Sequence, residues 1–120
     1  MIDLERTLET ADLVAYAGAT WDWHRLHHDL AYVAGRGLDR PVVDGQLLGA
    51  LMAEHAQDWA GPGARLTRLR YRLHSMVFAG DTVRVTGAVT RVDGARTTIE
   101  QQVLAGDRVA ATGTAEVTTR

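Results

Sequence analysis

The chain has 120 residues, of which 46% are hydrophobic and 23% are charged, as is typical of a folded domain and not of a disordered segment. A formal net charge of −2 gives no basis for electrostatic capture of nucleic acid or of an anionic membrane. The absence of cysteine excludes disulfide scaffolds, thiolate metal sites and cysteine nucleophiles.

We therefore expect one domain over residues 1–120, with no nucleic acid or membrane partner. The first ten residues, "MIDLERTLET", lack the apolar segment of a signal peptide, and no apolar run approaches the roughly 20 residues of a membrane span. Together with the lack of cysteine, these features favour a cytoplasmic protein.

Residues 1–60 are predicted to contain helices and loops. A first helix over 10–20 has Thr10 as a capping residue and Gly18 near its end, both in the positions that helix termini favour. A loop over 21–29 follows. The next segment predicts a short helix that begins at Asp29 and ends at Gly35.

The longest predicted helix covers about 45–59, and Gly61, Pro62 and Gly63 end it. Apolar residues recur along it at helical spacing. Its second stripe consists of small residues: Gly45, Gly49, Ala53 and Ala56. Glycine inside a helix costs about 1 kcal/mol relative to alanine, so we expect a sheet that packs closely on this stripe to offset the cost.

After residue 64 the hydrophobic period changes from helical to alternating. Strands are predicted over 69–74, 82–92, 96–105 and 108–117, with turns at 92–95 and 106–107, where Asp-Gly and Gly-Asp pairs occur. Half-buried strands need a cover, and only the helix at about 45–59 is long enough. The fold class is therefore α+β, a curved antiparallel sheet wrapped around a long central helix.

The segment "WDWHRLHHD", residues 21–29, gathers three of the five histidines and two of the three tryptophans of the chain. Three interpretations are open. Its histidines and aspartates offer metal ligands, although adjacent histidines diverge and no helical His-x-x-x-His pair is present. The polar side chains could instead bond only to nearby backbone groups, with Asp29 as a helix cap. The third interpretation is acid–base chemistry by Asp22 and His27, with Trp21 and Trp23 excluding water.

The order of these residues resembles the hydratase motif of MaoC-like (R)-specific enoyl-CoA hydratases and acyl dehydratases, which have the hotdog fold. The resemblance lies in Asp22, His27 five positions later, Asp29, then "AYVAGRG" and the glycine-led helix in "VVDGQLLGAL". It covers most of the chain from about residue 16. It is greatest to small actinobacterial members, including the short catalytic subunit of a steroid enoyl-CoA hydratase.

The resemblance implies a hydro-lyase that hydrates a trans-2-enoyl thioester or dehydrates a 3-hydroxyacyl thioester. Asp22 and His27 would hold one water and act as the acid–base pair. The N–H of Gly45, at a helix start, would bind the thioester oxygen as it gains charge. The substrate-binding residues would be Trp21, Trp23, Tyr32, Val43, Gln46 and Leu47. We expect no metal and no cofactor beyond the coenzyme A or carrier protein that bears the acyl group.

Two positions depart from the family pattern. The usual Asn-Pro is replaced by His24-Arg25, and Asp44 stands where the family usually has histidine before the helix-leading glycine. In the family neither position carries the central proton transfers, but both border the pocket, so the resemblance implies that substrate choice is more affected than chemistry.

The expected assembly is a homodimer, because hotdog sheets join edge to edge and place the active site at the subunit interface. One alternative is a subunit that needs a different hotdog chain to complete its acyl pocket. Another is a hotdog thioesterase, which usually has an acidic residue on the central helix. Here only Glu54 lies in mid-helix, on the polar side.

Overall fold

The computed structural model describes residues 1–119 as a five-stranded sheet with three α-helices and one 3₁₀ turn. In chain order the elements are β1 (Leu4–Thr7), α1 (Thr10–Thr20), η1 (Arg25–His27), α2 (Leu30–Gly35), α3 (Gly45–Ala60), β2 (Ala64–Leu73), β3 (Thr82–Asp93), β4 (Arg96–Ala105) and β5 (Arg108–Thr119). None of the helices within residues 1–119 has the length and hydropathy of a membrane span.

The sheet is antiparallel throughout, in the order β1-β3-β4-β5-β2. The turn glycines of both predicted hairpins have positive φ, +60° at Gly94 and +61° at Gly106, as tight connections require. β2 does not pair with β3, the next strand along the chain, but with β5. The segment 74–81 therefore crosses from one edge of the sheet toward the other.

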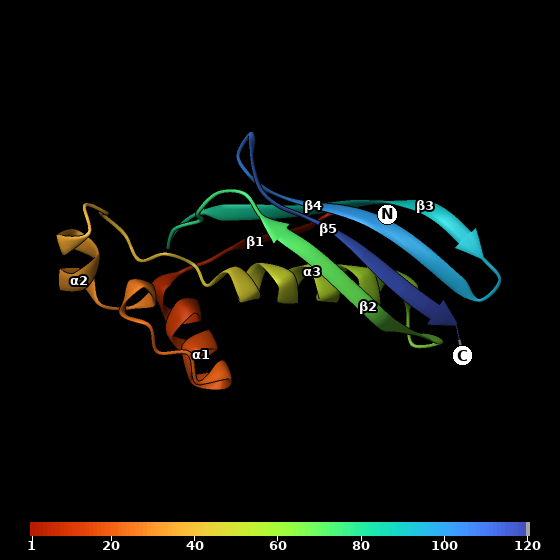
Figure 1. Cartoon of the computed structure of the whole chain (residues 1–120), viewed down its shortest axis with the longest axis horizontal. Coiled ribbons are helices and arrows are strands. Elements are labelled where there is room, and N and C mark those ends of the chain that lie inside the picture. Colours follow the sequence, from red (N-terminus) through yellow and green to blue (C-terminus); the bar gives the residue numbers. More distant parts are fainter. Residues whose placement is uncertain (120) are drawn as a thin grey trace.

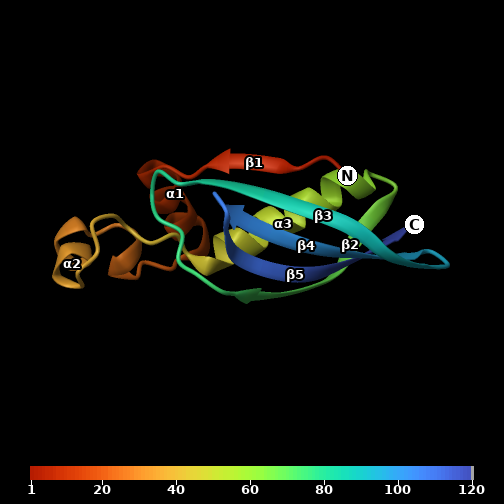
Figure 2. The same ribbon diagram turned by 90° about the horizontal axis from the view of Figure 1, so that it is seen from above.

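The sheet curves over α3, which lies along its inner face (Figures 1 and 2). This arrangement confirms the predicted fold class. The glycines allow the close contact: a Cβ on Gly49 would lie 2.6 Å from Cε1 of Tyr71, and a Cβ on Gly113 of β5 would lie 2.5 Å from Cε of Met52. A larger residue would meet the Tyr71 ring at Gly49 and the Arg70 carbonyl oxygen of β2 at Gly113, so neighbouring atoms would have to shift.

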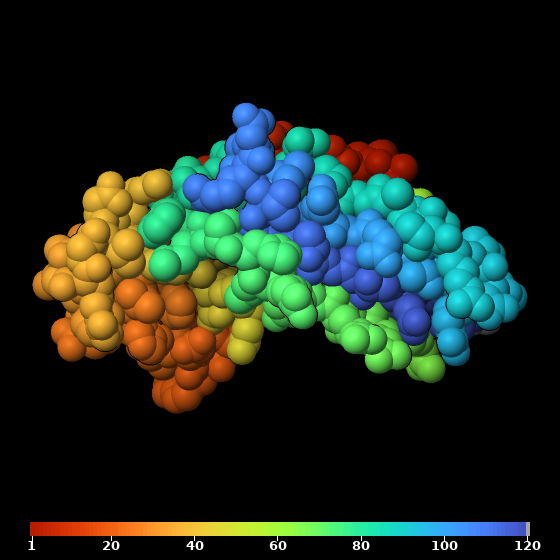
Figure 3. All heavy atoms as spheres, turned by 45° about the horizontal axis from the view of Figure 1, so that its top comes forward, coloured from red at the N-terminus to blue at the C-terminus, as the bar shows by residue number. Residues whose placement is uncertain are grey.

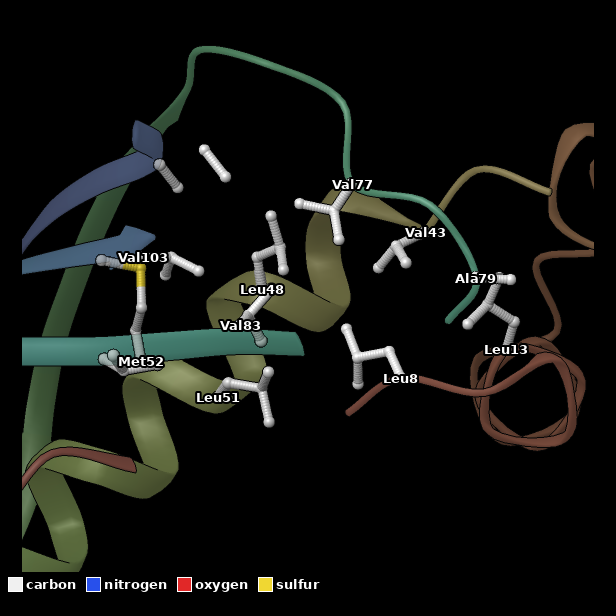
Figure 4. Close-up of a cluster of buried hydrophobic side chains, with 13 residues drawn as sticks. Leu8, Leu13, Val43, Leu48, Leu51, Met52, Val77, Ala79, Val83 and Val103 are labelled. Carbon is white, nitrogen blue, oxygen red and sulfur yellow. The ribbon is translucent and has the colours of Figure 1, made fainter. Parts of the chain in front are cut away.

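The hydrophobic core fills the space between α3 and the sheet (Figure 4). Met52, Val83 and Val103 are completely buried there. Leu8 and Leu13 extend the same cluster to the start of α1. The core therefore fixes α1 and the start of α3, the two helices between which the candidate site lies.

The N-terminal region differs from the prediction in three details. β1 was not predicted, because a four-residue strand with three exposed side chains has no buried alternating face. Glu9, not Thr10, is the N-cap of α1. The helix occupies Thr10–Thr20, the predicted range, but Trp21 and not Gly18 is its C-cap, with a left-handed φ of 59°. Such a conformation is uncommon for a residue other than glycine.

Residues 21–44 form one end of the molecule, together with α1 (Figures 1 and 3). The β3–β4 hairpin lies at the opposite end. Short helices and turns make up the end formed by residues 21–44, and the chain leaves it to enter α3 at Gly45.

Candidate active site

His27 is held by the backbone of the segment that leads into α3. Its Nδ1 lies 2.6 Å from the carbonyl oxygen of Val42. A carbonyl can only accept, so Nδ1 carries the hydrogen and Nε2 keeps a free lone pair. Val42 is itself fixed, since its N–H donates to the carbonyl of Leu26 at 2.8 Å. Backbone contacts thus set both the direction of the ring and its tautomer.

Asp44 is the N-cap of α3 and also faces His27. Its Oδ1 accepts from the Gln46 N–H at 2.9 Å. Its Oδ2 lies 4.0 Å from Nε2 of His27, and the two side chains are 13% and 14% exposed, respectively. Oδ2 is buried and has no hydrogen-bond partner among residues 1–119. One oxygen therefore serves the helix, and the other points into the site.

Asp22 approaches from the end of α1. Its backbone N–H donates to the carbonyl of Ala17 at 3.1 Å, which extends the last turn of the helix. Its Oδ1 accepts a long hydrogen bond of 3.4 Å from the His24 N–H. One side-chain oxygen or nitrogen atom from each of Asp22, His27 and Asp44 lies within 4.8 Å of the other two. The structure thus brings together the predicted pair and a third group that the sequence interpretation did not include.

The two carboxyl groups shift each other's pKa in opposite directions. Burial raises the pKa of Asp44, and the neighbouring Asp22 raises it further. A hydrogen bond with Asp44 lowers the pKa of Asp22, as does the His24 N–H. Such a bond exists only if one of the carboxyl groups is protonated. Because Asp44 is the more buried of the two, it is the one whose charged form is the more disfavoured.

These polar groups line a crevice between α1 and the start of α3. Its apolar wall consists of Leu13, Tyr16, Ala17 and Leu47. Burial raises the pKa of the Tyr16 hydroxyl, so it stays a neutral donor. The crevice is too narrow for a whole water molecule, so side chains that line it would have to move for water or substrate to enter.

The remaining polar residues of 21–29 bond to neighbouring groups. Nδ1 of His24 accepts from the Leu26 N–H at 3.1 Å and caps η1. Nε2 of His28 lies 3.1 Å from the carbonyl of Trp23. Asp29 caps α2, as predicted, through the Tyr32 N–H at 3.1 Å. Of the three histidines, only His27 faces the crevice.

A metal ion would also find suitable ligand atoms here, since the three groups offer oxygen, nitrogen and oxygen within 4.8 Å. The sequence argument against a metal rested on the histidines alone and did not consider Asp44. Chelation distinguishes a bound metal ion from an acid–base site without metal.

Gly45 is the first residue of α3, next to Asp44. Its N–H donates to no acceptor within the described chain and so is available to a ligand. The absent Cβ has a structural reason as well, because a side chain here would collide with Cδ1 of Leu73. Leu73, and not open space, occupies the position where we expected the thioester to approach.

The predicted substrate-binding residues lie in three settings. Leu47 lines the crevice, Gln46 is exposed beside it, and Val43 is 4% exposed within the core. Trp21 and Trp23 meet edge to face at 5.9 Å and are 80% and 41% exposed. Tyr32 lies between two guanidinium groups, with Arg25 4.9 Å and Arg36 5.1 Å from its ring centre. The two tryptophans therefore present an aromatic surface outside the crevice and do not close it.

Comparison with known proteins gives a consistent result. The family model described as a MaoC-like domain matches residues 2–111. The 3-oxo-4,17-pregnadiene-20-carboxyl-CoA hydratase beta subunit of Mycobacterium tuberculosis is 32% identical over 102 residues, 83% of this chain and 79% of that protein. The (R)-specific enoyl-CoA hydratase of Aeromonas caviae is 30% identical over 118 residues, 95% of this chain and 88% of the relative.

Solved structures agree. The chain superimposes on a chain of the ChsH1–ChsH2 complex from Mycobacterium tuberculosis with a TM-score of 0.93 and 28% identity, covering 100% of this chain and 94% of the other. For the (R)-hydratase from A. caviae involved in PHA biosynthesis the TM-score is 0.92 with 28% identity, over 99% and 93% of the two chains.

Proposed function

Because the chain belongs to the family of MaoC-like domains, we propose that it is an enoyl-thioester hydratase that also catalyses the reverse dehydration of a 3-hydroxyacyl thioester. The observation that carries this proposal is that Asp22 and His27 face one crevice at the N-terminus of α3. A free helix N–H lies beside them, at Gly45.

In this mechanism His27 is the general base. Its Nε2 takes a proton from water as the water oxygen bonds to the β-carbon of the enoyl thioester. The hydrogen bond from Nδ1 to Val42 keeps the ring in the tautomer that this step needs. Asp22 orients the same water and lies on the path of the proton that reaches the α-carbon.

Negative charge develops on the thioester oxygen during the addition. The N–H of Gly45 points out of the first turn of α3, where the helix dipole also favours negative charge. A thioester bound there would displace Leu73, whose side chain is 50% exposed and free to turn. The acyl group would then extend past Leu47 toward Trp21 and Trp23, with coenzyme A or a carrier protein outside.

The assembly that we propose joins two hotdog chains along β2, one of the two edge strands of the sheet. Tyr71 and Leu73 are exposed on this strand, at 39% and 50%, and a partner chain would cover them. A homodimer and a heteromer are both compatible with this edge. The heteromer, in which the partner completes the acyl pocket, is favoured by the similarity to a chain of the two-component ChsH1–ChsH2 complex.

A thioesterase would need an acidic group of α3 in the site. Glu54, the candidate in mid-helix, instead forms a two-bond ion pair with Arg6 of β1, at 2.9 and 3.1 Å. It is not among the residues that line the crevice. The geometry therefore favours hydration over thioester cleavage.

The test is turnover of crotonyl-CoA and of longer and ring-bearing enoyl-CoAs, followed by the loss of enoyl absorbance. Asp22→Asn and His27→Ala should each lower kcat by roughly 10²- to 10⁴-fold, the usual contribution of a positioned acid or base. The matched control is His28→Ala, which removes an adjacent histidine that bonds only to Trp23 and should leave kcat nearly unchanged. Full activity in both site variants would refute the assignment.

The same assay separates an independent enzyme from a subunit. An active chain that elutes as a dimer in size-exclusion chromatography supports the homodimer. A folded but inactive chain that gains activity with a second MaoC-like chain supports the heteromer.

A further inference from the structure

We propose that Asp44 is a proton-holding partner of Asp22, so that the two carboxyl groups share one proton and together act as the acid of the reaction. This inference rests on the proposed function and extends it to a residue that departs from the family pattern. Asp44 acts through Asp22 and is therefore a positioning residue.

The two oxygens of Asp44 have different surroundings. Capping α3 needs one oxygen of Asp44, and Oδ1 supplies it. Oδ2 is not needed for the cap, yet it is buried without a partner. One oxygen of Asp44 and one of Asp22 lie within 4.8 Å of each other. A buried carboxylate oxygen without a donor is costly. A proton between the two carboxyl groups removes both the unpaired oxygen and the repulsion of two negative charges.

The opposite pKa shifts of the two groups agree with this arrangement. The pKa of Asp44 is raised and that of Asp22 is lowered, as expected of two carboxyl groups that interact closely. The other ionisable side chains facing the pair are Tyr16 from α1 and His24 and His27 from the loop. His24 is occupied at Nδ1 by the Leu26 N–H.

The proton balance of hydration also favours a carboxyl pair that holds a proton. Hydration takes one proton from water and adds one to the α-carbon, so the site needs a base and an acid at once. With Nδ1–H bonded to Val42, a neutral His27 is a base. An isolated ionised Asp22 would be a second base, and the Tyr16 hydroxyl, whose pKa is raised by burial, would be a poor source of the α-proton. A pair with one shared proton supplies it from Asp22 as His27 accepts the proton of water.

A final proton transfer returns the site to its starting state. After addition, His27 carries a proton at Nε2 and the carboxyl pair has lost its own. Nε2 lies 4.0 Å from Oδ2 of Asp44, so a small rotation lets the histidine donate to Asp44. The net result is one water added across the double bond, with every group in its original protonation state.

The first experiment needs no substrate. The carboxyl carbons of aspartate are followed by carbon NMR through a pH titration. In the wild type, Asp22 and Asp44 should both respond to the same two steps, one below and one above the ordinary aspartate range. Asp44→Asn should abolish the upper step and leave one step at Asp22. Independent single steps in the wild type, or an upper step that survives in Asp44→Asn, would overturn the proposal.

The second experiment measures catalysis. Asp44→Asn keeps the cap and a donor toward Asp22 but cannot release a proton, so we expect kcat to fall by roughly 10²-fold with KM largely unchanged. The alkaline limb of the kcat profile, which in the wild type should coincide with the upper titration step, should disappear. Asp44→Ser keeps the cap, cannot share a proton, and should show the same loss of kcat.

Equal thermal stability of these variants and the wild type would show that the cap is intact. Wild-type kcat and pH profile in Asp44→Asn would show that Asp44 is a helix cap only, and would refute the inference. The two proposals fail separately. A chain that turns over no enoyl thioester but has coupled carboxyl titrations refutes the function alone, whereas normal hydration with uncoupled titrations refutes only the shared proton.

Discussion

The core between α3 and the sheet and the active-site end at residues 21–44 are stabilised in different ways. In the core, side chains such as Met52 and Ile99 are fully buried, and the stabilisation comes from many non-directional contacts. At the active-site end, His27, Asp29 and Asp44 are each held by one or two bonds to a backbone group. A core change should therefore mainly reduce stability, and a change at the polar groups that face the crevice should mainly alter chemistry.

A substitution in the core should give the largest change in stability. Met52→Ala removes a fully buried side chain from between α3 and the sheet and should lower the free energy of unfolding by about 2–5 kcal/mol. Urea denaturation measures it, and Leu30→Ala, at a side chain that is 66% exposed, is the control. The kcat of the folded fraction should stay at the wild-type value. A large loss of kcat in Met52→Ala would show that the core and the site are not independent.

A smaller effect is expected at the cap of α2. Asp29→Ala removes the acceptor of the Tyr32 N–H and the ion-pair partner of Arg25, so the melting temperature should fall, but by less than in Met52→Ala. The Tyr32 N–H and Arg25 lower the pKa of Asp29, so its stabilising effect is present above the unfolded-state pKa and is lost as pH falls through the folded-state pKa. In Asp29→Asn, which keeps an acceptor oxygen, this part of the acid dependence should disappear. An unchanged acid dependence would contradict the role given to the carboxylate.

Removal of metal ions should have the smallest effect on activity. Dialysis against EDTA should leave hydratase activity unchanged, because His27 and the carboxyl pair supply both proton transfers. Re-addition of Zn²⁺ or Mn²⁺ should not increase the activity either. If chelation abolishes turnover and a metal restores it, then Asp22, His27 and Asp44 are ligands and the shared-proton interpretation is wrong.

The sequence predicted the secondary structure best where the hydrophobic period is strong. β4 was expected over 96–105 and occupies Arg96–Ala105, and the helix expected over 45–59 occupies Gly45–Ala60. β2 was expected to start at residue 69 but starts at Ala64, and β1 was not predicted. The pairing of β2 with β5 was not predicted either, because alternation shows which face of a strand is buried and not which strand lies beside it.

The candidate site was predicted in part for a similar reason. Asp22 and His27 are five positions apart in one loop, and the structure places both at one crevice. Asp44 was noted only as a departure from the family pattern. One signal could have identified it: an aspartate directly before a glycine-led helix is a cap, and the second oxygen of such a cap is free to face whatever packs against the helix start.

The sequence by itself determined that residues 45–60 form a helix with one apolar and one small-residue stripe, and that an alternating sheet covers it. These features follow from local periods of 3.6 and 2 residues. Only the tertiary structure decided which polar groups meet. It buried His55 against Gln101 of β4, with 2.8 Å between Nδ1 and Nε2, and brought Asp44 to Asp22, 22 positions away in the chain. Such contacts between distant residues depend on the packing of the cluster that contains Leu8, Leu13 and Val43. No local sequence pattern encodes that packing.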